Sequence, residues 1–483
     1  MESRHEEFIR QNAGKLSARQ LAKATGLSRT EIERYLERSK KTRSAAAAPE
    51  PPKPLTGPAR FLLPAAVFAA ALAFKFVFAH LFSQTPFFEP LSAPTPKKMD
   101  DGLYDQMALE ILGGNWIGDF PLGPYRLPGY AYFLAGVYKL FGHRIDAVHF
   151  LQAGLGATSV LLVYFLSREI FKDVRAAVVS SALTLLYMPL SYFENFLLGE
   201  TLAIFLTLAA VCLVVRALRG PNPAAGLLAP GLLLGVSALF RPNVLLPCGF
   251  LAVFFLLYPV VRGKAWGKGF AAAAVFSLAC VAPLAPVAVR NWKLYHDFVP
   301  ISAIGGVNFY LGNNAEAIGS FVETKGLSGN LDDILHESIS QAEEAAGRPL
   351  KASEVSAYWS KKAFDFLAAR PALAARVFGV KLNTLLNNDE MPDVLDMYFV
   401  AGFMPLLKLY RVVGFSLILL ASFFAWPLLR RAEAVGPPRE EPSRGGAPGG
   451  AAVVGVFLAG YALSVLAIFV SSRYRLPLVP FLA

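Results

Sequence analysis

Long apolar runs recur along this chain of 483 residues, and each is about as long as a helix that crosses a membrane. Roughly 20 apolar residues in helical form span the hydrocarbon layer of a bilayer. The runs of this kind lie at residues 61–82, 146–171, 176–194, 199–217, 224–239, 243–261, 269–289, 408–429 and 451–471. They predict an all-α polytopic membrane protein with about 9 to 11 spans.

Two long polar stretches, at residues 83–145 and 290–405, separate groups of these runs. Loops longer than about 15 residues usually either carry a function or fold separately. Basic residues gather in the other loops, at Arg168, Lys172, Arg175, Arg216, Arg219, Arg262, Lys264, Lys268, Arg430, Arg431, Arg439 and Arg444. Because cytoplasmic loops are enriched in Lys and Arg, both long loops are expected on the outer face and residues 430–450 on the inner face.

An apolar piece at 372–386 is predicted to be interfacial or re-entrant, because a span there would invert every later loop against the charge rule. Lys75 lies inside the first span. A charge at that depth either faces the bundle interior or extends toward the membrane surface, and the sequence does not separate the two.

The first 50 residues are polar and lack the apolar core of a signal peptide, so the N-terminus is expected in the cytoplasm. Within residues 1–40 the pattern predicts a helix, a turn at Gly26 and a second helix capped by Ser28, as in helix-turn-helix modules. DNA reading by Ser28, Arg29 and Thr30, within residues 15–38, is one interpretation. A protein-binding or inert appendage is favoured, because two helices make a small core. Residues 41–58 form a Pro/Ala linker before the membrane domain at 59–483.

Composition supports this interpretation. Hydrophobic residues make up 55% of the chain and charged residues 17%, whereas soluble domains have about 25% charged residues. The three cysteines all lie in apolar runs, where they are expected to pack rather than form disulfides or bind metal. The net charge of +11 is explained by basic inner loops and does not require nucleic-acid binding.

Candidate chemistry lies at the outer ends of the spans. The charged residues there are Asp100, Asp101, Arg126, Glu194, Glu200, Arg241, Arg290, Arg473 and Arg475. Carboxylates and guanidiniums at one membrane depth indicate a site for an anionic lipid head group next to a proton acceptor. Any one arginine at a span end is explained by its usual reach toward the membrane surface. The unusual local sequences Arg-Leu-Pro-Gly-Tyr and Arg-Tyr-Arg-Leu-Pro favour a site.

Several of these segments carry a resemblance that covers residues 60–483. They are Asp100-Asp101-Gly-Leu-Tyr104, Arg126-Leu-Pro-Gly-Tyr130, Arg241-Pro242-Asn243, Arg290-Asn291-Trp292, Gly312-Asn313-Asn314 and Arg473-Tyr474-Arg475-Leu476-Pro477. On these motifs the sequence resembles the GT-C superfamily of integral-membrane glycosyltransferases. The likeness is greatest to bacterial relatives of the protein O-mannosyltransferases and to the lipid A aminoarabinose transferase. It implies a GT-C-type helix bundle.

The resemblance also implies roles for individual residues. Asp100 is the expected general base, although Asp101 stays an alternative, and Glu200 is a second acidic residue of the site. Arg126 is the expected contact to the donor phosphate. Further candidates for phosphate binding are Arg241, Arg290, Arg473 and Arg475, and candidates that shape the substrate site are Tyr104, Tyr130 and Asn313. Tyr125 stands where the aminoarabinose transferase has an acidic metal ligand, so no cofactor is expected to be required, with a divalent cation as the alternative.

The chemistry agrees with these roles. A sugar on a polyprenyl phosphate already has a good leaving group, so one carboxylate to deprotonate an acceptor hydroxyl and cations to hold the phosphate suffice. We expect hexosyl or pentosyl transfer, with inversion, to a protein, lipid or glycan acceptor at the outer face of a bacterial cytoplasmic (inner) membrane. A transporter or a membrane-tethered regulator that uses the N-terminal module are the alternatives.

Overall fold

The computed structural model describes residues 9, 17–28, 30–33, 36, 57–88, 100–120, 123–261, 263, 265–320, 327, 331–393, 395–434 and 449–483. Several predictions fall outside these residues: most of the linker at 41–58, and the basic residues Arg29, Arg262, Lys264, Arg439 and Arg444. The chain divides into two compact units, Met1–Pro54 and Leu55–Ala483.

The N-terminal unit contains α2 (Ala18–Thr25), and its local sequence explains both helix ends. The Ser17 side chain accepts a hydrogen bond from the backbone N–H of Gln20, and the Ser17 backbone N–H donates one to Oε1 of Gln20, so the two residues form a capping box. The helix ends at Gly26, which has the left-handed φ of 74° that favours glycine. The predicted turn therefore lies at Gly26, while DNA binding stays a prediction.

The described part of the second unit is helical, with no strand. Its elements are α4 (Ala59–Ser83), α5 (Asp100–Leu112), η2 (Gly123–Tyr125), α6 (Gly129–Phe141), α7 (Ile145–Phe171), α8 (Val174–Leu186), α9 (Met188–Phe193), α10 (Glu200–Ala217), α11 (Pro223–Gly226), α12 (Leu228–Ala238), η3 (Pro242–Val244), α13 (Leu245–Val261), α14 (Trp266–Val281), η4 (Ala282–Leu284), α15 (Ala285–Tyr295), α16 (Gly305–Gly312), α17 (Leu331–Ala346), α18 (Ala352–Ala369), α19 (Pro371–Leu386), α20 (Met397–Val400), η5 (Pro405–Arg411), α21 (Phe415–Ala434), α22 (Gly450–Ala467), α23 (Ser472–Arg475), η6 (Leu476–Leu478) and α24 (Val479–Leu482). The prediction of an all-α polytopic membrane protein is confirmed.

Within the described residues, six helices are long and apolar enough to cross a membrane, and the bent pair of η5 and α21 makes a seventh if it counts as one span. The predicted span at 176–194 is instead two helices, because the chain breaks at Tyr187 and α9 begins at Met188, with Pro189 in its first turn. At about 1.5 Å per residue, the 13 residues of α8 cover only about two thirds of a 30 Å hydrocarbon layer. The count of nine spans stays a prediction.

Close helix packing builds the bundle. α12 packs against α10 and α14, and α14 packs against α13. Gly231 and Gly235 lie one turn apart on α12, and a Cβ at either would overlap atoms of Ala279 or Cys280 on α14. Small residues at this spacing let two membrane helices approach closely.

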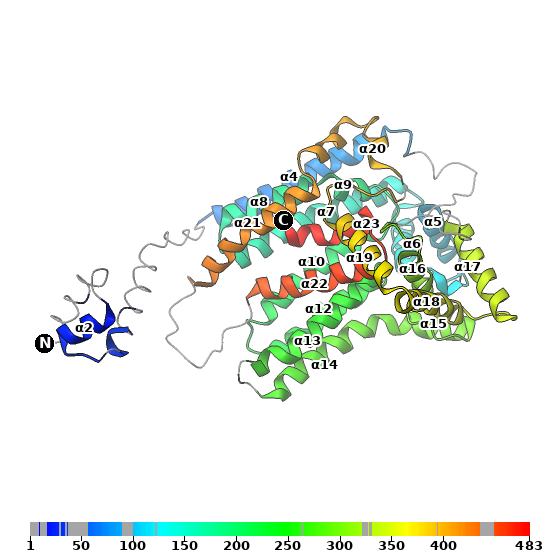
Figure 1. Cartoon of the computed structure of the whole chain (residues 1–483). Coiled ribbons are helices and arrows are strands. Elements are labelled where there is room, and N and C mark those ends of the chain that lie inside the picture. Colours follow the sequence, from blue (N-terminus) through cyan, green and yellow to red (C-terminus); the bar gives the residue numbers. More distant parts are fainter. Residues whose placement is uncertain are drawn as a thin grey trace. The chain divides into compact units, whose positions relative to one another are not determined.

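The two long loops meet at one end of this bundle. Figure 1 shows α5 and α6 of the first loop beside α16, α17 and α18 of the second. The described parts of both loops thus lie at the same end of the bundle, while their placement on the outer face of the membrane stays a prediction. The segment predicted to be interfacial or re-entrant is α19, and it buries Val377, Lys381, Thr384 and Leu385.

Candidate active site

A cavity of about 670 Å³ lies where the two long loops meet the ends of the bundle helices. The charged residues that line it are Asp100, Arg126, Glu200, Arg241, Asp393 and Arg473. Its lining therefore holds as many arginines as carboxylates. Segments from Asp100 to Tyr474 contribute to the cavity, so only the complete fold assembles it.

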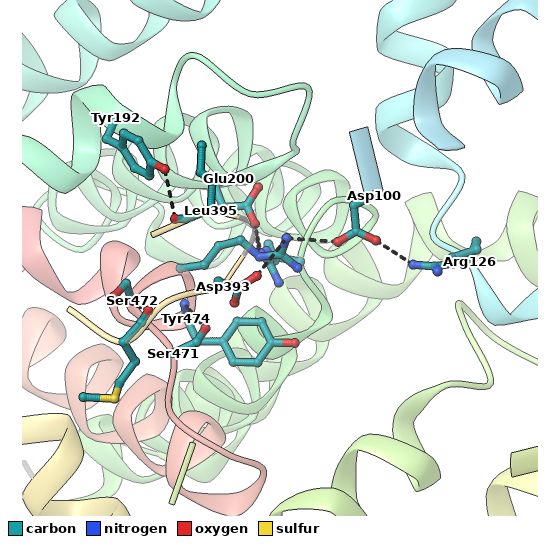
Figure 2. A network of polar contacts seen from close by, with 12 residues as sticks. Asp100, Arg126, Tyr192, Glu200, Asp393, Leu395, Ser471, Ser472 and Tyr474 are labelled. Carbon is teal, nitrogen blue, oxygen red and sulfur yellow. Dashed lines mark hydrogen bonds and ion pairs between the residues drawn. The ribbon is translucent and has the colours of Figure 1, made fainter. Parts of the chain in front are cut away.

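Arg473 joins all three carboxylates of the cavity. Its Nη1 lies 3.0 Å from Oδ2 of Asp100 and 3.4 Å from Oδ1 of Asp393, and its Nε lies 3.0 Å from Oε1 of Glu200. Figure 2 shows the carboxylates of Asp100, Glu200 and Asp393 directed toward one another from separate segments. One guanidinium thus connects the first long loop, a membrane helix and the second long loop.

Asp100 lies between two guanidiniums. It is the first residue of α5, where the helix dipole favours a negative charge, and Arg126 Nη1 lies 2.7 Å from its Oδ1. Burial by itself raises the pKa of the Asp100 carboxyl. The positive charges of Arg473 and Arg126 together lower this pKa by more than burial raises it, so the pKa lies below its ordinary value. Asp100 is therefore an anion at neutral pH.

Glu200 and Arg241 form a further ionic pair in the lining. Glu200 begins α10 and is 2% exposed, and the guanidinium of Arg241 also lies 4.9 Å from the ring centre of Tyr474. Buried charges need such partners, because desolvation is costly.

Neutral polar groups complete the lining. They include Tyr104, Tyr125, Asn243, Ser302 and Asn308. The Ser302 hydroxyl donates to the Tyr125 carbonyl at 2.6 Å, whereas the buried Asn243 Nδ2 has no hydrogen-bond partner among the described residues. A donor of this kind can bind a hydroxyl or ring oxygen of a ligand.

The predicted residues separate into two groups. Asp100, Tyr104, Arg126, Glu200, Arg241 and Arg473 all line the cavity. Asp101 does not belong to its described lining, although it is next to Asp100 in the chain, and its Oδ1 accepts the N–H of Gly102 at 2.9 Å. Tyr130 is buried beneath Tyr104 and donates to Gln152 Oε1 at 2.7 Å.

Arg290 and Arg475 lie outside the described lining and hold loop backbone. Arg290 Nε donates to the Ile117 carbonyl at 2.6 Å and its Nη2 to the Gly118 carbonyl. Arg475 donates to the carbonyls of Asn387 and Asp389 at 2.8 and 2.9 Å, and its Nη2 pairs with Glu390 at 2.7 Å. Asn313, which follows α16, also lies outside the described lining. Its Nδ2 donates to the carbonyl of Ala467, the last residue of α22.

Other residues of the lining were not predicted, and Asp393 and Tyr474 are two of them. Asp393 lies in a loop with Asp389 and Glu390, and no local pattern distinguishes it from them. Tyr474 belongs to the motif Arg473-Tyr474-Arg475-Leu476-Pro477, so the sequence motif could have identified it.

Lys75 faces the bundle interior, where its Nζ lies 2.7 Å from Oε1 of Glu194.

These features define a polytopic membrane protein that holds guanidiniums and an ionised carboxylate in one cavity at the end of its helix bundle. Comparisons with known proteins agree with this class. Residues 123–286 match the family described as dolichyl-phosphate-mannose-protein mannosyltransferase. The predicted resemblance to the GT-C superfamily is confirmed by this match and by a curated relative. That relative is undecaprenyl phosphate-alpha-4-amino-4-deoxy-L-arabinose arabinosyl transferase 2 of Sodalis glossinidius (strain morsitans), which is 30% identical over 196 residues.

The aligned part covers 38% of this chain and 34% of that relative. Two solved structures are also similar. Archaeal oligosaccharyltransferase AglB from Archaeoglobus fulgidus, solved with an inhibitory peptide and a dolichol-phosphate, has a TM-score of 0.38 and 14% identity, over 88% of this chain and 50% of that one. ArnT from Cupriavidus metallidurans, bound to undecaprenyl phosphate, has a TM-score of 0.37 and 13% identity, over 85% of this chain and 77% of that one.

Proposed function

We propose that this chain is a glycosyltransferase that moves a sugar from a polyprenyl phosphate to an acceptor hydroxyl at the outer face of a bacterial inner membrane, with its N-terminus in the cytoplasm. The position of Asp100 between Arg126 and Arg473 in the cavity carries this proposal. Relatives named for undecaprenyl or dolichyl phosphate support the class of donor. The acceptor is a hydroxyl of a protein, lipid or glycan.

In this proposal Asp100 is the general base, and Arg126, Arg241 and Arg473 bind the donor phosphate. The acceptor oxygen bonds to the anomeric carbon as the bond from that carbon to the phosphate oxygen breaks, which inverts the carbon. The acceptor proton passes to Asp100. Guanidiniums beside the phosphate stabilise the charge that develops on it.

Charge balance explains why the base lies among arginines. The donor phosphodiester carries one negative charge, and the departing phosphate monoester carries a second. Asp100 loses its own charge when it takes the acceptor proton. Arg126 and Arg473 thus lose one anionic partner while the phosphate between them gains charge, so the total charge of the cavity stays constant.

The lowered pKa of Asp100 couples base strength to donor binding. While both guanidiniums hold Asp100, its carboxylate is a weak base. A bound phosphate competes for the same guanidiniums, which weakens their hold on Asp100 and raises its basicity. We propose that the base is therefore activated when the donor is in place. The mechanism requires no cofactor.

The test uses the full chain in lipid nanodiscs with polyprenyl phosphates that carry a labelled sugar. Asp100→Asn keeps the size of the side chain and removes its charge, and we expect turnover to fall by roughly 10²- to 10⁴-fold, the usual contribution of a general base. Asp101→Asn is the matched control, and it should keep most of the activity. Wild-type turnover in Asp100→Asn, or an equal loss in Asp101→Asn, would refute the assignment.

A further inference from the structure

The chain turns sharply after α22, and the residues that follow line the cavity. α22 ends at Ala467, and Ile468 has φ −103° and ψ −103°, which is not helical. Ile468, Phe469, Arg473 and Tyr474 all line the cavity. The last carbonyls of a helix have no partner within that helix. Groups that bind these carbonyls therefore fix the start of the turn that leads to Arg473.

Two polar side chains bind the carbonyls at the end of α22. Lys381 Nζ, on α19, donates to the Leu466 carbonyl at 3.1 Å. Asn313 Nδ2, which follows α16, donates to the Ala467 carbonyl at 2.8 Å. The two side chains also contact each other, because Lys381 Nζ donates to Asn313 Oδ1 at 2.9 Å. The second outer loop thus holds the end of this membrane helix.

Lys381 is an unusual residue for this place. It is 1% exposed, and among the residues that the structure describes no carboxylate pairs with it. Burial lowers the pKa of its ammonium group to about 8. A buried cation without a carboxylate is costly, and the negative end of the α22 dipole offsets only part of this cost. Stability alone would favour an apolar side chain at this position.

The backbone near Asn313 holds the same turn. A Cβ on Gly312 would overlap the carbonyl oxygen of Ile468, so the two chains lie in direct contact there. The N–H of Val470 donates to the Gly319 carbonyl at 2.8 Å. The turn is thus held on both sides of Phe469, at Ile468 and Val470, which lie five and three residues before Arg473.

We propose that Lys381 and Asn313 are positioning residues that set Arg473 in the cavity and thereby determine the affinity for the lipid phosphate. This inference rests on the proposed function, because it takes Arg473 as a phosphate contact. Lys381 acts through Arg473 and does not touch the ligand. Asn313, predicted from sequence to shape the substrate site, does so indirectly, by fixing the turn that carries Arg473.

A double-mutant cycle in the full chain tests this inference. The probe is undecaprenyl phosphate, titrated into nanodiscs that hold the wild type, Lys381→Met, Arg473→Gln or both substitutions. We expect Lys381→Met to weaken binding by up to about tenfold, because a displaced Arg473 loses part of the charged hydrogen bond that it makes to the phosphate. In the Arg473→Gln background the same substitution should have no further effect, because residues that act as one unit are not additive.

The control is Lys361→Met on α18, which removes an exposed lysine that pairs with Asp365, and its binding should equal that of the wild type. Asn313→Asp is a second variant, since it keeps the contact to Lys381 and loses the donor to Ala467. It should also weaken binding. Unchanged binding in both Lys381→Met and Asn313→Asp, or additive effects of Lys381→Met and Arg473→Gln, would overturn the inference and leave the proposed function intact. A wild type that binds no undecaprenyl phosphate would overturn both.

Discussion

Replacing Arg473 with glutamine removes a guanidinium that contacts all three carboxylates of the cavity. Asp100, Glu200 and Asp393 would then share only Arg126 and Arg241, and the lining would carry one net negative charge. A hydrogen bond to a charged group contributes about 1.5–3 kcal/mol. The loss of one such hydrogen bond weakens the binding of a phosphate by roughly 10- to 100-fold. The carboxylate left without a cation also repels the phosphate.

The assay measures two quantities on the same preparation, the Kd for undecaprenyl phosphate and the kcat/KM for the labelled donor. Both should worsen by at least the factor given above. Arg348→Gln is the control, because it removes an exposed arginine that pairs with Glu354 and leaves the cavity unchanged. Equal Kd values for the wild type and Arg473→Gln would refute the assignment of Arg473 to the phosphate.

The pH dependence of kcat/KM gives an independent test of the same substitution. In the wild type the pKa of Asp100 lies below its ordinary value of 3.8, so Asp100 stays ionised at all higher pH and produces no loss of activity there. Arg473 is the strongest of the nearby charges that lower this pKa. In Arg473→Gln the pKa therefore rises, and the acid limb of kcat/KM should move to higher pH. An acid limb at the same pH in both proteins would contradict the argument.

The remaining predictions concern the membrane domain and the metal question. A Cβ on Gly156 would overlap the Glu194 carboxylate, which its buried ion pair with Lys75 holds in place, so Gly156→Ala should destabilise the protein by about 1–3 kcal/mol in thermal unfolding, whereas Gly154→Ala, with open space around it, should be neutral. Lys75→Met leaves Glu194 buried without its cation and should cost about 3–5 kcal/mol, and adding Glu194→Gln should recover most of that loss. Chelation with EDTA should leave sugar transfer unchanged, and a loss that zinc or magnesium restores would show that the cavity needs a metal.

The long apolar runs predicted the helices well, because a helix that crosses a bilayer needs about 20 consecutive apolar residues. Each predicted span contains helix in the structure. The pattern did not predict the break at Tyr187, because an apolar run looks the same whether or not it is interrupted. Only Pro189 marks that position, and prolines also occur inside continuous helices such as α4, at Pro64.

The sequence nominated single residues for the candidate site, and six of those eleven residues line the cavity, but it did not predict how they assemble. Arg473 and Arg475 stand in one motif, two positions apart, and share the same local signals. Arg473 contacts the carboxylates of the cavity, whereas Arg475 contacts loop carbonyls near Glu390. The acceptors within reach of each guanidinium come from segments that are distant in sequence, so no local pattern separates the two arginines.

The backbone adds a contribution that the charge pattern of the sequence does not reveal. Asp100, Glu200 and Gly305 are the first residues of α5, α10 and α16, and all three line the cavity. A helix N-terminus carries a partial positive charge of about half a unit, together with unpaired N–H groups. The side chains of the lining are balanced in charge, so these three helix ends make the cavity positive on balance. An anionic phosphate is therefore favoured even though every arginine of the lining already has a carboxylate partner.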